Sequence, residues 1–309
     1  MSLIVLKPGF QSTLQDLGRN GFTHLGISPA GAADSFSFRL GNLLVGNGEN
    51  DTGLEMTLVG GTYHFNQSVL VVLTGSRFRA TLVGAEFPFF VAVHVKKGQE
   101  LDIGPSQDGA RCFLTVKGGF NVPQVLDSRS THLMTQLGGY KGRALKKGDQ
   151  INFGDSSTSR EPEKLEKIME SDRSVLRVTQ GLQYDRFESK IRDVFFRERF
   201  IVSQRSNRMG LRTEGPEIKA GIIDEILTEG LPIGAVQVPG NGHPIISFVD
   251  HQTTGGYPKI ANVIAADLCK VGQLKPGDEF KFQLVSVAEA EKLYFEQESF
   301  FQKFTHSNS

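Results

Sequence analysis

Short runs of β-branched and aromatic residues recur along this 309-residue chain, each closed by glycine, proline or polar residues. They cover residues 69–73 (VLVVL), 89–95 (FFVAVHV), 112–116 (CFLTV), 199–202 (RFIV) and 244–249 (PIISFV). Runs of this length and composition are typical of β-strands. The 35 glycines fit the many turns that short strands need. The sequence therefore predicts a mainly β protein.

Few segments have helical spacing. Asp34 is a good N-cap residue and Gly46 a good residue to follow a helix end, so a helix is predicted between them. Its apolar residues fall at i, i+4, i+7 and i+8: Phe36, Leu40, Leu43 and Leu44. The same spacing predicts a second helix from Phe187, Ile191, Val194 and Phe195. A third is expected over residues 288–303.

The length is comfortable for two domains. Residues 155–174 (DSSTSREPEKLEKIMESDRS) are polar and charged, which is typical of a linker. We therefore expect a β-rich half over residues 1–155, a linker over 156–174, and a second half over 175–309 that ends in a helix. LKKGDQINF, LKPGDEFKF and VKKGQELDI predict three tight turns that each enter a strand. Distant repetition and convergent turn chemistry both explain them.

Composition excludes several classes of partner. Lys plus Arg equals Asp plus Glu at 34 each, so no excess charge favours nucleic acid or an acidic membrane. No apolar run approaches the ~18 residues of a membrane span, and Pro8 interrupts the N-terminal apolar stretch, so a cytoplasmic protein is expected. The two cysteines, Cys112 and Cys269, lie in apolar runs and are predicted to be buried free thiols.

The common local catalytic motifs are absent from the sequence. There is no G-x-x-x-x-G-K-[ST] loop for phosphate, no G-x-S-x-G elbow, and no C-x-x-C or H-x-x-x-H pair for a metal. No metal site is therefore expected, and any catalytic site must come from distant loops.

Two arginine-containing clusters are denser in functional groups than folding requires. In residues 127–149, Arg129 and Ser130 present a guanidinium and a hydroxyl to an anion, although ordinary turn chemistry explains them equally well. In residues 203–215 (SQRSNRMGLRTEG), Arg208 follows Asn207, and arginine suits carboxylate or phosphate. A solvated turn is the alternative there.

The stretch DHQTTGGYP, residues 250–258, is the strongest candidate for a ligand-binding loop. Gly255 and Gly256 allow close approach of a ligand to the backbone, and Pro258 restricts Tyr257 to an extended conformation. The other polar groups come from Asp250, Gln252, Thr253 and Thr254. A plain strand-to-helix turn needs fewer of them. Upstream, Gln237 stands in a short apolar strand, where it either faces solvent or orients a ligand amide.

Ten motifs occur in the order seen in one known family. They are QDLGRNG, PAGAAD, N-x-LVGN, LE-x-T, SRST, GGYKGR, NRMGLR, QVP, HPI and QTTGGYP. Over residues 8 to about 282 the chain resembles the allophanate hydrolase subunit 2 family. That family is also known as the 5-oxoprolinase C subunit, KipA-like protein and biotin-dependent carboxyltransferase domain family. His251 departs from the family pattern, in which arginine or a small residue is commoner.

The resemblance implies a cyclophilin-like β-barrel architecture and two partners. One is a subunit 1 protein (KipI-like, the 5-oxoprolinase B subunit), and the other is a LamB/YcsF-type protein, the 5-oxoprolinase A subunit. Together they imply ATP-dependent opening of 5-oxoproline to glutamate, with ATP shared among the three proteins and Mg²⁺ as an optional companion.

Two alternatives stay open. One is transfer of a carboxyl group from biotin to urea or a similar amide, as in urea amidolyase. The other is a non-catalytic regulator that antagonises a kinase inhibitor. The chain has no M-K-M biotinyl context and no fused carboxylase half, which favours 5-oxoprolinase.

Under this resemblance the candidate residues take separate roles. Arg208, the Thr253 and Thr254 hydroxyls and the N–H groups at Gly255 and Gly256 are expected to meet developing negative charge. Asp250 is expected to position water or accept a proton. Gln237 and Gln252 are expected to bind the lactam amide. The remaining expected substrate contacts are Asn207, Arg129, Ser130 and Tyr257.

Overall fold

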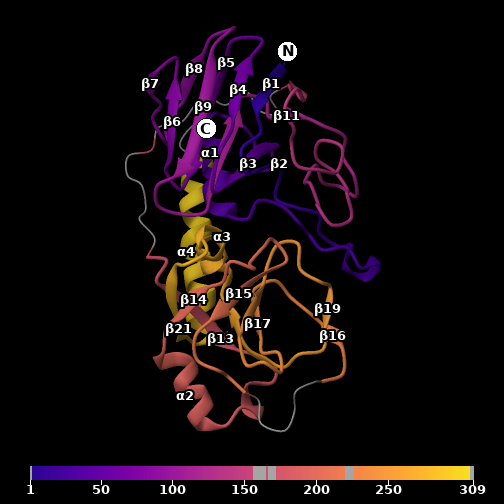
Figure 1. Cartoon of the computed structure of the whole chain (residues 1–309), viewed down its shortest axis with the longest axis vertical. Helices are drawn as coiled ribbons and strands as arrows, with labels where there is room; N and C mark the ends of the chain where they lie inside the picture. The colour runs from indigo at the N-terminus through magenta and orange to yellow at the C-terminus, as the bar shows by residue number, and fades with distance from the viewer. Residues whose placement is uncertain (1, 156–164, 166–171, 220–225, 307–309) are drawn as a thin grey trace. The chain divides into compact units, whose positions relative to one another are not determined.

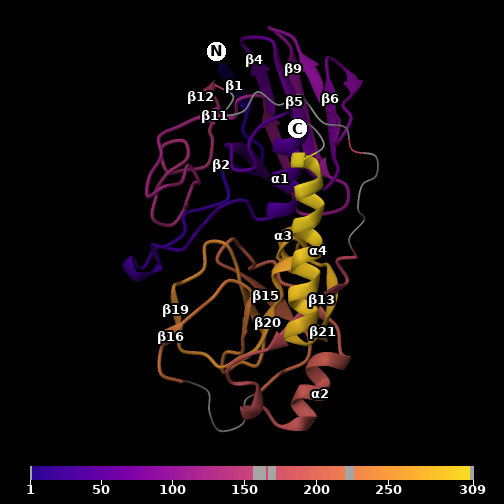
Figure 2. The ribbon, with the colours of Figure 1, turned by 180° about the vertical axis from the view of Figure 1, so that it is seen from behind.

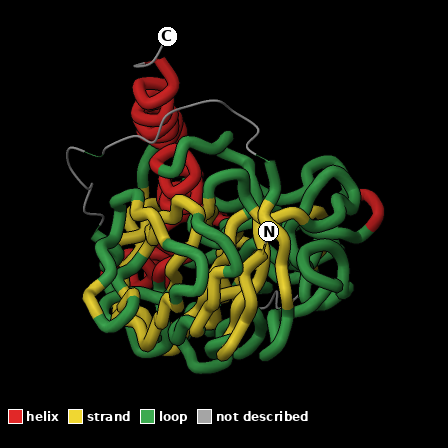
Figure 3. Tube along the Cα trace, turned by 90° about the horizontal axis from the view of Figure 1, so that it is seen from above, coloured by secondary structure: helices red, strands yellow, loops and turns green. Residues whose placement is uncertain are grey.

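The computed structural model describes residues 2–155, 165, 172–219 and 226–306 (Figure 1). The chain forms two compact units. The first comprises Met1–Asn20, Ala30–Met169 and Lys303–Ser309, and the second comprises Gly21–Pro29 and Glu170–Gln302. The predicted linker, residues 156–174, lies mostly outside the described residues. Strands and loops make up most of the trace, and helix is confined to a few segments (Figure 3).

Two sheets build the first unit. A seven-stranded sheet has the order β11-β12-β1-β4-β9-β6-β7, and a five-stranded sheet has the order β2-β3-β10-β5-β8. The seven strands of the first sheet are β1 (Ser2–Lys7), β4 (Thr62–Phe65), β6 (Phe78–Leu82), β7 (Ala85–Glu86), β9 (Glu100–Ser106), β11 (Phe120–Asn121) and β12 (Gln150–Phe153). Those of the second are β2 (Gln11–Gln15), β3 (Gly53–Thr57), β5 (Val69–Gly75), β8 (Val93–Val95) and β10 (Arg111–Val116).

One apolar core joins these two sheets. It takes residues from both, including Leu3, Tyr63, Leu73 and Leu114, which are all fully buried. All pairings in the two sheets are antiparallel. The predicted strand over 89–95 is shorter in the structure because Phe90 has φ +61°, which breaks extended backbone before β8.

Helix α1 (Ser35–Leu44) begins and ends where the sequence predicts. The Asp34 side chain accepts from Ser37 N–H at 2.9 Å, and Gly46 has φ +78° just beyond the last turn. The helix lies close to the five-stranded sheet at Gly41, where an added Cβ would lie 2.8 Å from Thr74 Oγ1. Thr115 Oγ1 donates to the Gly41 carbonyl at 2.9 Å.

The second unit is a closed barrel with the strand order β13-β20-β17-β18-β15-β14-β21. Its strands are β13 (Val175–Gln180), β14 (Phe200–Val202), β15 (Gly210–Glu214), β17 (Ala235–Gln237), β18 (Ile245–Ser247), β20 (Lys259–Val263) and β21 (Glu279–Leu284). The parallel pairing of β13 with β21 closes it. A separate two-stranded ribbon pairs β16 (Glu229–Gly230) with β19 (Thr254–Gly255).

Phenylalanine rings pack part of this barrel. Phe195, from helix α2 (Ser189–Arg197), stacks on Phe282 with ring centroids 4.4 Å apart, and both rings contact Phe200. Helix α3 (Leu268–Gln273) follows β20. Figure 2 shows helix α4 (Val287–His306) in yellow. Its residues Ala290 and Leu293 pack on a buried cluster that includes Val285. Short 3-10 turns cover Thr23–Leu25, Tyr184–Arg186 and Ala265–Asp267.

The three predicted turns share one geometry. In the turn at Gly148, Asp149 N–H donates to Lys146 O at 3.1 Å, and Asp149 Oδ2 accepts from Lys146 N–H at 2.7 Å. Gly148 N–H then donates to Val5 O at 2.8 Å, and Val5 N–H donates to Asp149 O at 2.9 Å. The turn is thus closed on itself and hydrogen-bonded to a neighbouring strand.

The turns at Gly98 and Gly277 repeat this pattern. Each exchanges the same two backbone hydrogen bonds with another segment, through Phe65 and Val202 respectively. The glycine φ angles are +86°, +90° and +91° at positions 98, 148 and 277. Only glycine adopts such angles without strain, which explains the K-x-G signal in the sequence.

The predicted mainly β architecture is confirmed, and all three predicted helices are present. Of the two predicted buried thiols, Cys112 is buried but Cys269 is only half-buried. Cys269 lies on the short helix α3, where it donates to Ala266 O at 3.4 Å.

Candidate functional site

The β16–β19 ribbon holds part of the predicted ligand-binding loop. Glu229 pairs with Gly255 and Gly230 with Thr254 in antiparallel register. Flanking backbone bonds extend the pairing, with Leu231 N–H donating to Thr253 O at 3.0 Å. The stretch is followed by strand β20 rather than by a helix, so it is a structured ribbon beside the barrel.

Gln237 is the last residue of β17 and is 8% exposed. Its Nε2 is buried and has no hydrogen-bond partner within the described part of the chain. An added Cβ at Gly255 would lie 2.4 Å from this nitrogen. The Gln237 carboxamide therefore fills the space that a side chain at position 255 would need, and two residues that the sequence predicts separately for the site lie together.

Lys259 and Glu229 complete this cluster. Lys259 pairs with Gln237 across β17 and β20, and its side chain is 1% exposed. Its Nζ donates to Glu229 Oε1 at 2.5 Å, and Glu229 Oε1 also accepts from Gln183 Nε2 at 2.9 Å. Gln183 Oε1 accepts from Lys259 N–H at 2.9 Å. A buried ammonium requires such a counterion, so these contacts fix the Glu229 carboxylate in place.

The hydrogen bond from Lys259, followed by that from Gln183, lowers the pKa of Glu229. Glu229 is therefore an ionised hydrogen-bond acceptor at neutral pH and a weak base. We call Gln183, Glu229, Gln237, Gly255 and Lys259 the rim cluster. Nothing in the sequence marks Gln183, Glu229 and Lys259, which lie in separate segments and carry no motif of their own.

Arg208 and Asp250 form a buried ion pair in the same unit. Arg208 Nε donates to Asp250 Oδ2 at 2.9 Å. Asp250 N–H also donates to Arg208 O at 2.9 Å. Asn207 is exposed, and its Oδ1 accepts from Met209 N–H at 2.8 Å within the turn before β15. The structure thus joins two predicted site residues to each other and places Asn207 in a local turn.

The remaining loop residues have different exposures. Gln252, Thr254 and Tyr257 are exposed, and Thr253 and Gly256 are half-buried. His251 is buried, and its Nδ1 lies 2.7 Å from Gln252 O. Burial lowers the pKa of His251, so its ring is neutral at pH 7.

Arg129 and Ser130 belong to the first unit, where they surround Asp16. The Ser130 hydroxyl donates to Asp16 Oδ1 at 2.5 Å, and Arg129 N–H donates to Asp16 Oδ2 at 2.5 Å. Ser128 Oγ donates to the same carboxylate at 2.7 Å. Asp16 therefore anchors this segment beside β2. The Arg129 side chain itself is exposed and donates from Nε to Val122 O at 3.2 Å.

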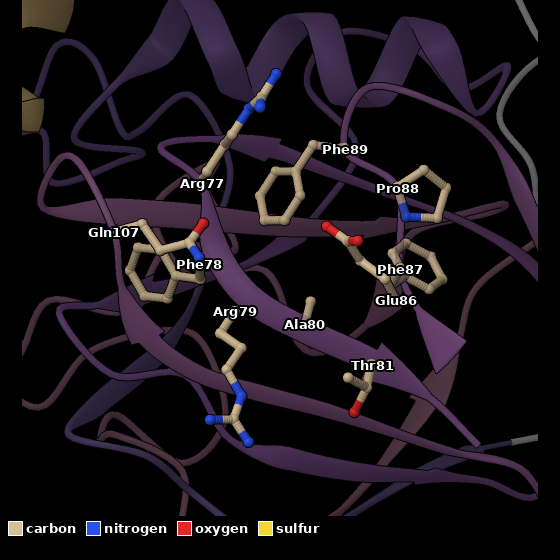
Figure 4. Close-up of a pocket in the computed structure, with 10 residues that line it drawn as sticks. All are labelled: Arg77, Phe78, Arg79, Ala80, Thr81, Glu86, Phe87, Pro88, Phe89 and Gln107. Carbon is tan, nitrogen blue, oxygen red and sulfur yellow. The ribbon is translucent and has the colours of Figure 1, made fainter. Parts of the chain in front are cut away.

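A hollow of about 330 Å³ lies in the first unit beside β6 and β7. Figure 4 shows Arg77 and Arg79 pointing away from its centre and the Glu86 carboxylate pointing toward the ring of Phe89. Its lining is completed by Phe78, Ala80, Thr81, Phe87, Pro88 and Gln107. None of the residues predicted for the site lines this hollow.

Two kinds of feature are absent from the described residues. No group of three His, Cys, Asp or Glu side chains is placed to hold a metal ion among them. Nor does any helix in this part of the chain have the length and apolar character needed to cross a membrane.

The sequence model of the "Carboxyltransferase domain, subdomain A and B" matches residues 25–284. The chain belongs to the carboxyltransferase domain family. This confirms the resemblance that the sequence motifs predict.

Named relatives in the carboxyltransferase domain family fall into two groups. The chain is 38% identical to the 5-oxoprolinase C subunit of Escherichia coli, over 97% of both chains. It is 34% identical to urea amidolyase of Saccharomyces cerevisiae, over 94% of this chain but 17% of that protein. The solved urea carboxylase of Kluyveromyces lactis matches with a TM-score of 0.93 at 32% identity, over 98% of this chain and 29% of that one.

Proposed function

We propose that this protein is the C subunit of an ATP-dependent 5-oxoprolinase. The reaction is 5-oxo-L-proline plus ATP and water to L-glutamate, ADP and phosphate. The observation that carries the proposal is the match to the 5-oxoprolinase C subunit, which covers 97% of both chains. The urea amidolyase match covers 17% of that longer protein. The proposed partners are a KipI-like B subunit and a LamB/YcsF-type A subunit. The three proteins together are proposed to use ATP, accompanied by Mg²⁺.

Opening a lactam requires activation of the amide carbonyl and fixed donors for the charge that develops on oxygen. In this chain the candidate donors are the hydroxyls of Thr253 and Thr254 and the backbone N–H of Gly256, because the predicted donor Gly255 N–H is used in the ribbon pairing with Glu229. Arg208 and Asp250 act as a pair, because each already holds the other. Because the pair is buried and mutually neutralised, its proposed role is to hold the loop that follows Asp250 in place. Gln252 and Tyr257 provide exposed contacts to substrate.

The test is ATP-dependent glutamate formation from 5-oxoproline by this chain co-expressed with the two proposed partners. Each of the three proteins is omitted in turn. Turnover that requires this chain supports the proposal. No turnover from three folded and assembled proteins contradicts it.

The urea amidolyase and urea carboxylase relatives favour a second candidate, carboxyl transfer between biotin and an amide such as urea. Free carboxybiotin and urea distinguish the two candidates. Allophanate formation by this chain with its KipI-like partner, without glutamate formation from 5-oxoproline, favours carboxyl transfer. If neither reaction occurs, the regulatory binding function remains, and binding of a partner protein becomes its test.

A further inference from the structure

The side chains of Glu229 and Gln237 lie on one face of the β16–β19 ribbon. Glu229 and Gly255 are directly opposite each other in antiparallel register, so their Cβ directions share a face. The Cβ that Gly255 lacks would lie 2.4 Å from Gln237 Nε2. The Gln237 carboxamide thus occupies the space beside Glu229 where the side chain of residue 255 would stand.

The Gln237 carboxamide has hydrogen-bonding capacity to spare. Its Nε2 has no partner in the described chain, and the residue is 8% exposed, so the amide is mostly removed from water. A buried donor without a partner is costly, so this carboxamide is free to take another orientation in which its NH₂ group meets a ligand acceptor. As placed, Nε2 is buried, and a half-turn of the carboxamide exchanges nitrogen and oxygen, so that the NH₂ group takes the position of Oε1.

Glu229 offers the complementary acceptor. Its Oε1 is taken by Lys259 Nζ and Gln183 Nε2, at 2.5 and 2.9 Å. Its Oε2 has no hydrogen bond to any described residue, and the side chain is 35% exposed. One oxygen of this carboxylate is therefore fixed by buried groups while the other faces outward.

A donor beside an acceptor matches an amide whose C=O and N–H point the same way. Lactams have this cis arrangement because the ring holds the carbon attached to C=O and the carbon attached to N on the same side of the amide bond. In urea, each nitrogen has one N–H that points the same way as the C=O. A trans peptide presents the two groups in opposite directions. The pair therefore favours lactams and ureas over ordinary peptides.

We propose that Gln237 and Glu229 bind the cis amide of the substrate, Gln237 donating to its carbonyl oxygen and Glu229 accepting from its N–H. This rests on the proposed function for the choice of 5-oxoproline as the lactam. Lys259 and Gln183 are positioning residues, since they hold Glu229 rather than touch substrate. The same arrangement accepts urea, which gives one site for both groups of relatives.

The first experiment measures binding of two probes to the full chain by isothermal titration or ligand-observed NMR. One probe is 5-oxo-L-proline. The other is its lactone analogue, which carries oxygen in place of the ring N–H. We expect the wild-type chain to bind the lactam at least about tenfold more tightly, because the lactone ring oxygen cannot donate to Glu229.

Two variants separate the two hydrogen bonds. Gln237→Met should weaken both probes by about tenfold, since both have a carbonyl. Glu229→Gln should reduce the preference for the lactam to near one, because a neutral amide can donate to the ring oxygen. Gln283→Met, on the exposed surface of β21, is the matched control and should leave both affinities unchanged.

Gly255→Ala gives a third variant that perturbs the site without removing a polar group. Its Cβ displaces the Gln237 carboxamide, which is the end of a flexible side chain, so the protein should remain folded. Weaker binding of both probes is expected. Thermal unfolding of all four variants verifies that each is folded.

The proposal is overturned if folded Gln237→Met and Glu229→Gln proteins keep wild-type affinity and wild-type preference for the lactam. It is also overturned if 5-oxoproline binds neither the full chain nor the assembled three-protein complex at millimolar concentration. Turnover by the assembled enzyme with an unchanged KM in both variants would reject this site while leaving the proposed function intact. If the assembled enzyme shows no turnover but the chain binds the lactam and the two variants weaken that binding, the site is supported and the proposed function is rejected.

Discussion

Arg208 and Asp250 neutralise each other inside the second unit. Arg208 donates from Nε and Nη2 to the two oxygens of Asp250, at 2.9 and 3.1 Å. Their side chains are 4% and 2% exposed. Because water cannot replace either partner, removing one leaves the other buried and charged.

We therefore expect Arg208→Ala and Asp250→Ala each to lower the free energy of unfolding by about 3–5 kcal/mol. The double replacement Arg208→Met with Asp250→Leu should lower the free energy of unfolding by less than either single replacement, since it leaves no buried charge. Urea denaturation at pH 7 measures all three. Single variants within about 0.5 kcal/mol of wild type would show that the pair is not a stabilising unit.

His251 should make the protein sensitive to mild acid. Burial lowers the pKa of the folded-state ring, whereas the unfolded chain titrates near 6.5. Below about pH 6.5 the unfolded state binds the extra proton first, so stability falls as the pH falls toward the folded-state pKa.

The variant His251→Asn should reduce this loss of stability between about pH 6.5 and 5. Urea midpoints at three pH values provide the measurement. His94→Asn, on the exposed side of β8, is the control and should keep the wild-type slope. If the His251 variant also loses stability with falling pH as steeply as the wild type, the buried ring of His251 is not the cause of that loss.

The shared turn gives a prediction about backbone strain. Gly98 has φ +86° and open space around an added Cβ, so Gly98→Ala tests the dihedral angle alone. We expect a loss of about 1–2 kcal/mol in the free energy of unfolding. Gly104→Ala, in the following strand β9, meets only an ordinary contact at 3.5 Å and should change stability by less than about 0.5 kcal/mol. Equal effects at the two positions would argue against a strained turn.

The two thiols should differ in reactivity. Cys112 is fully buried in β10, and burial raises the pKa of its thiol, so the reactive thiolate is scarce. Cys269 is half-buried on α3. Iodoacetamide followed by mass spectrometry should label Cys269 first in the native protein and both residues equally in urea. Faster native labelling of Cys112 would mean that the β10 region opens readily.

Local signals predicted much of the fold because they depend on near neighbours. Asp34, Gly46 and the helical spacing between them fix α1, and each K-x-G turn needs only one glycine with positive φ. The predicted strand over 89–95 fails at Phe90, whose φ of +61° has no sequence signature. The run FFVAVHV has the composition of a strand whatever the backbone angle at Phe90 is.

The rim cluster could be predicted only in part. Gln237 and the glycine pair stand out because an amide in an apolar strand and two adjacent glycines are locally unusual. Lys259 looks like a surface charge after Pro258, and its burial depends on Glu229, which precedes it by 30 residues. Glu229 in turn lies in a strand of two residues. No periodicity marks an element that short.

Closure of the barrel has a consequence for assembly. Each of its seven strands has a hydrogen-bonded neighbour on both sides. Strand β13, for example, pairs with β20 on one side and β21 on the other. A partner therefore cannot join this barrel by adding a strand to it, as a peptide can to an open sheet. Recognition by the barrel itself must use side chains and connecting loops. These can change between relatives without disturbing the hydrogen bonds of the scaffold, so a single barrel can acquire different associates through changes to its loops.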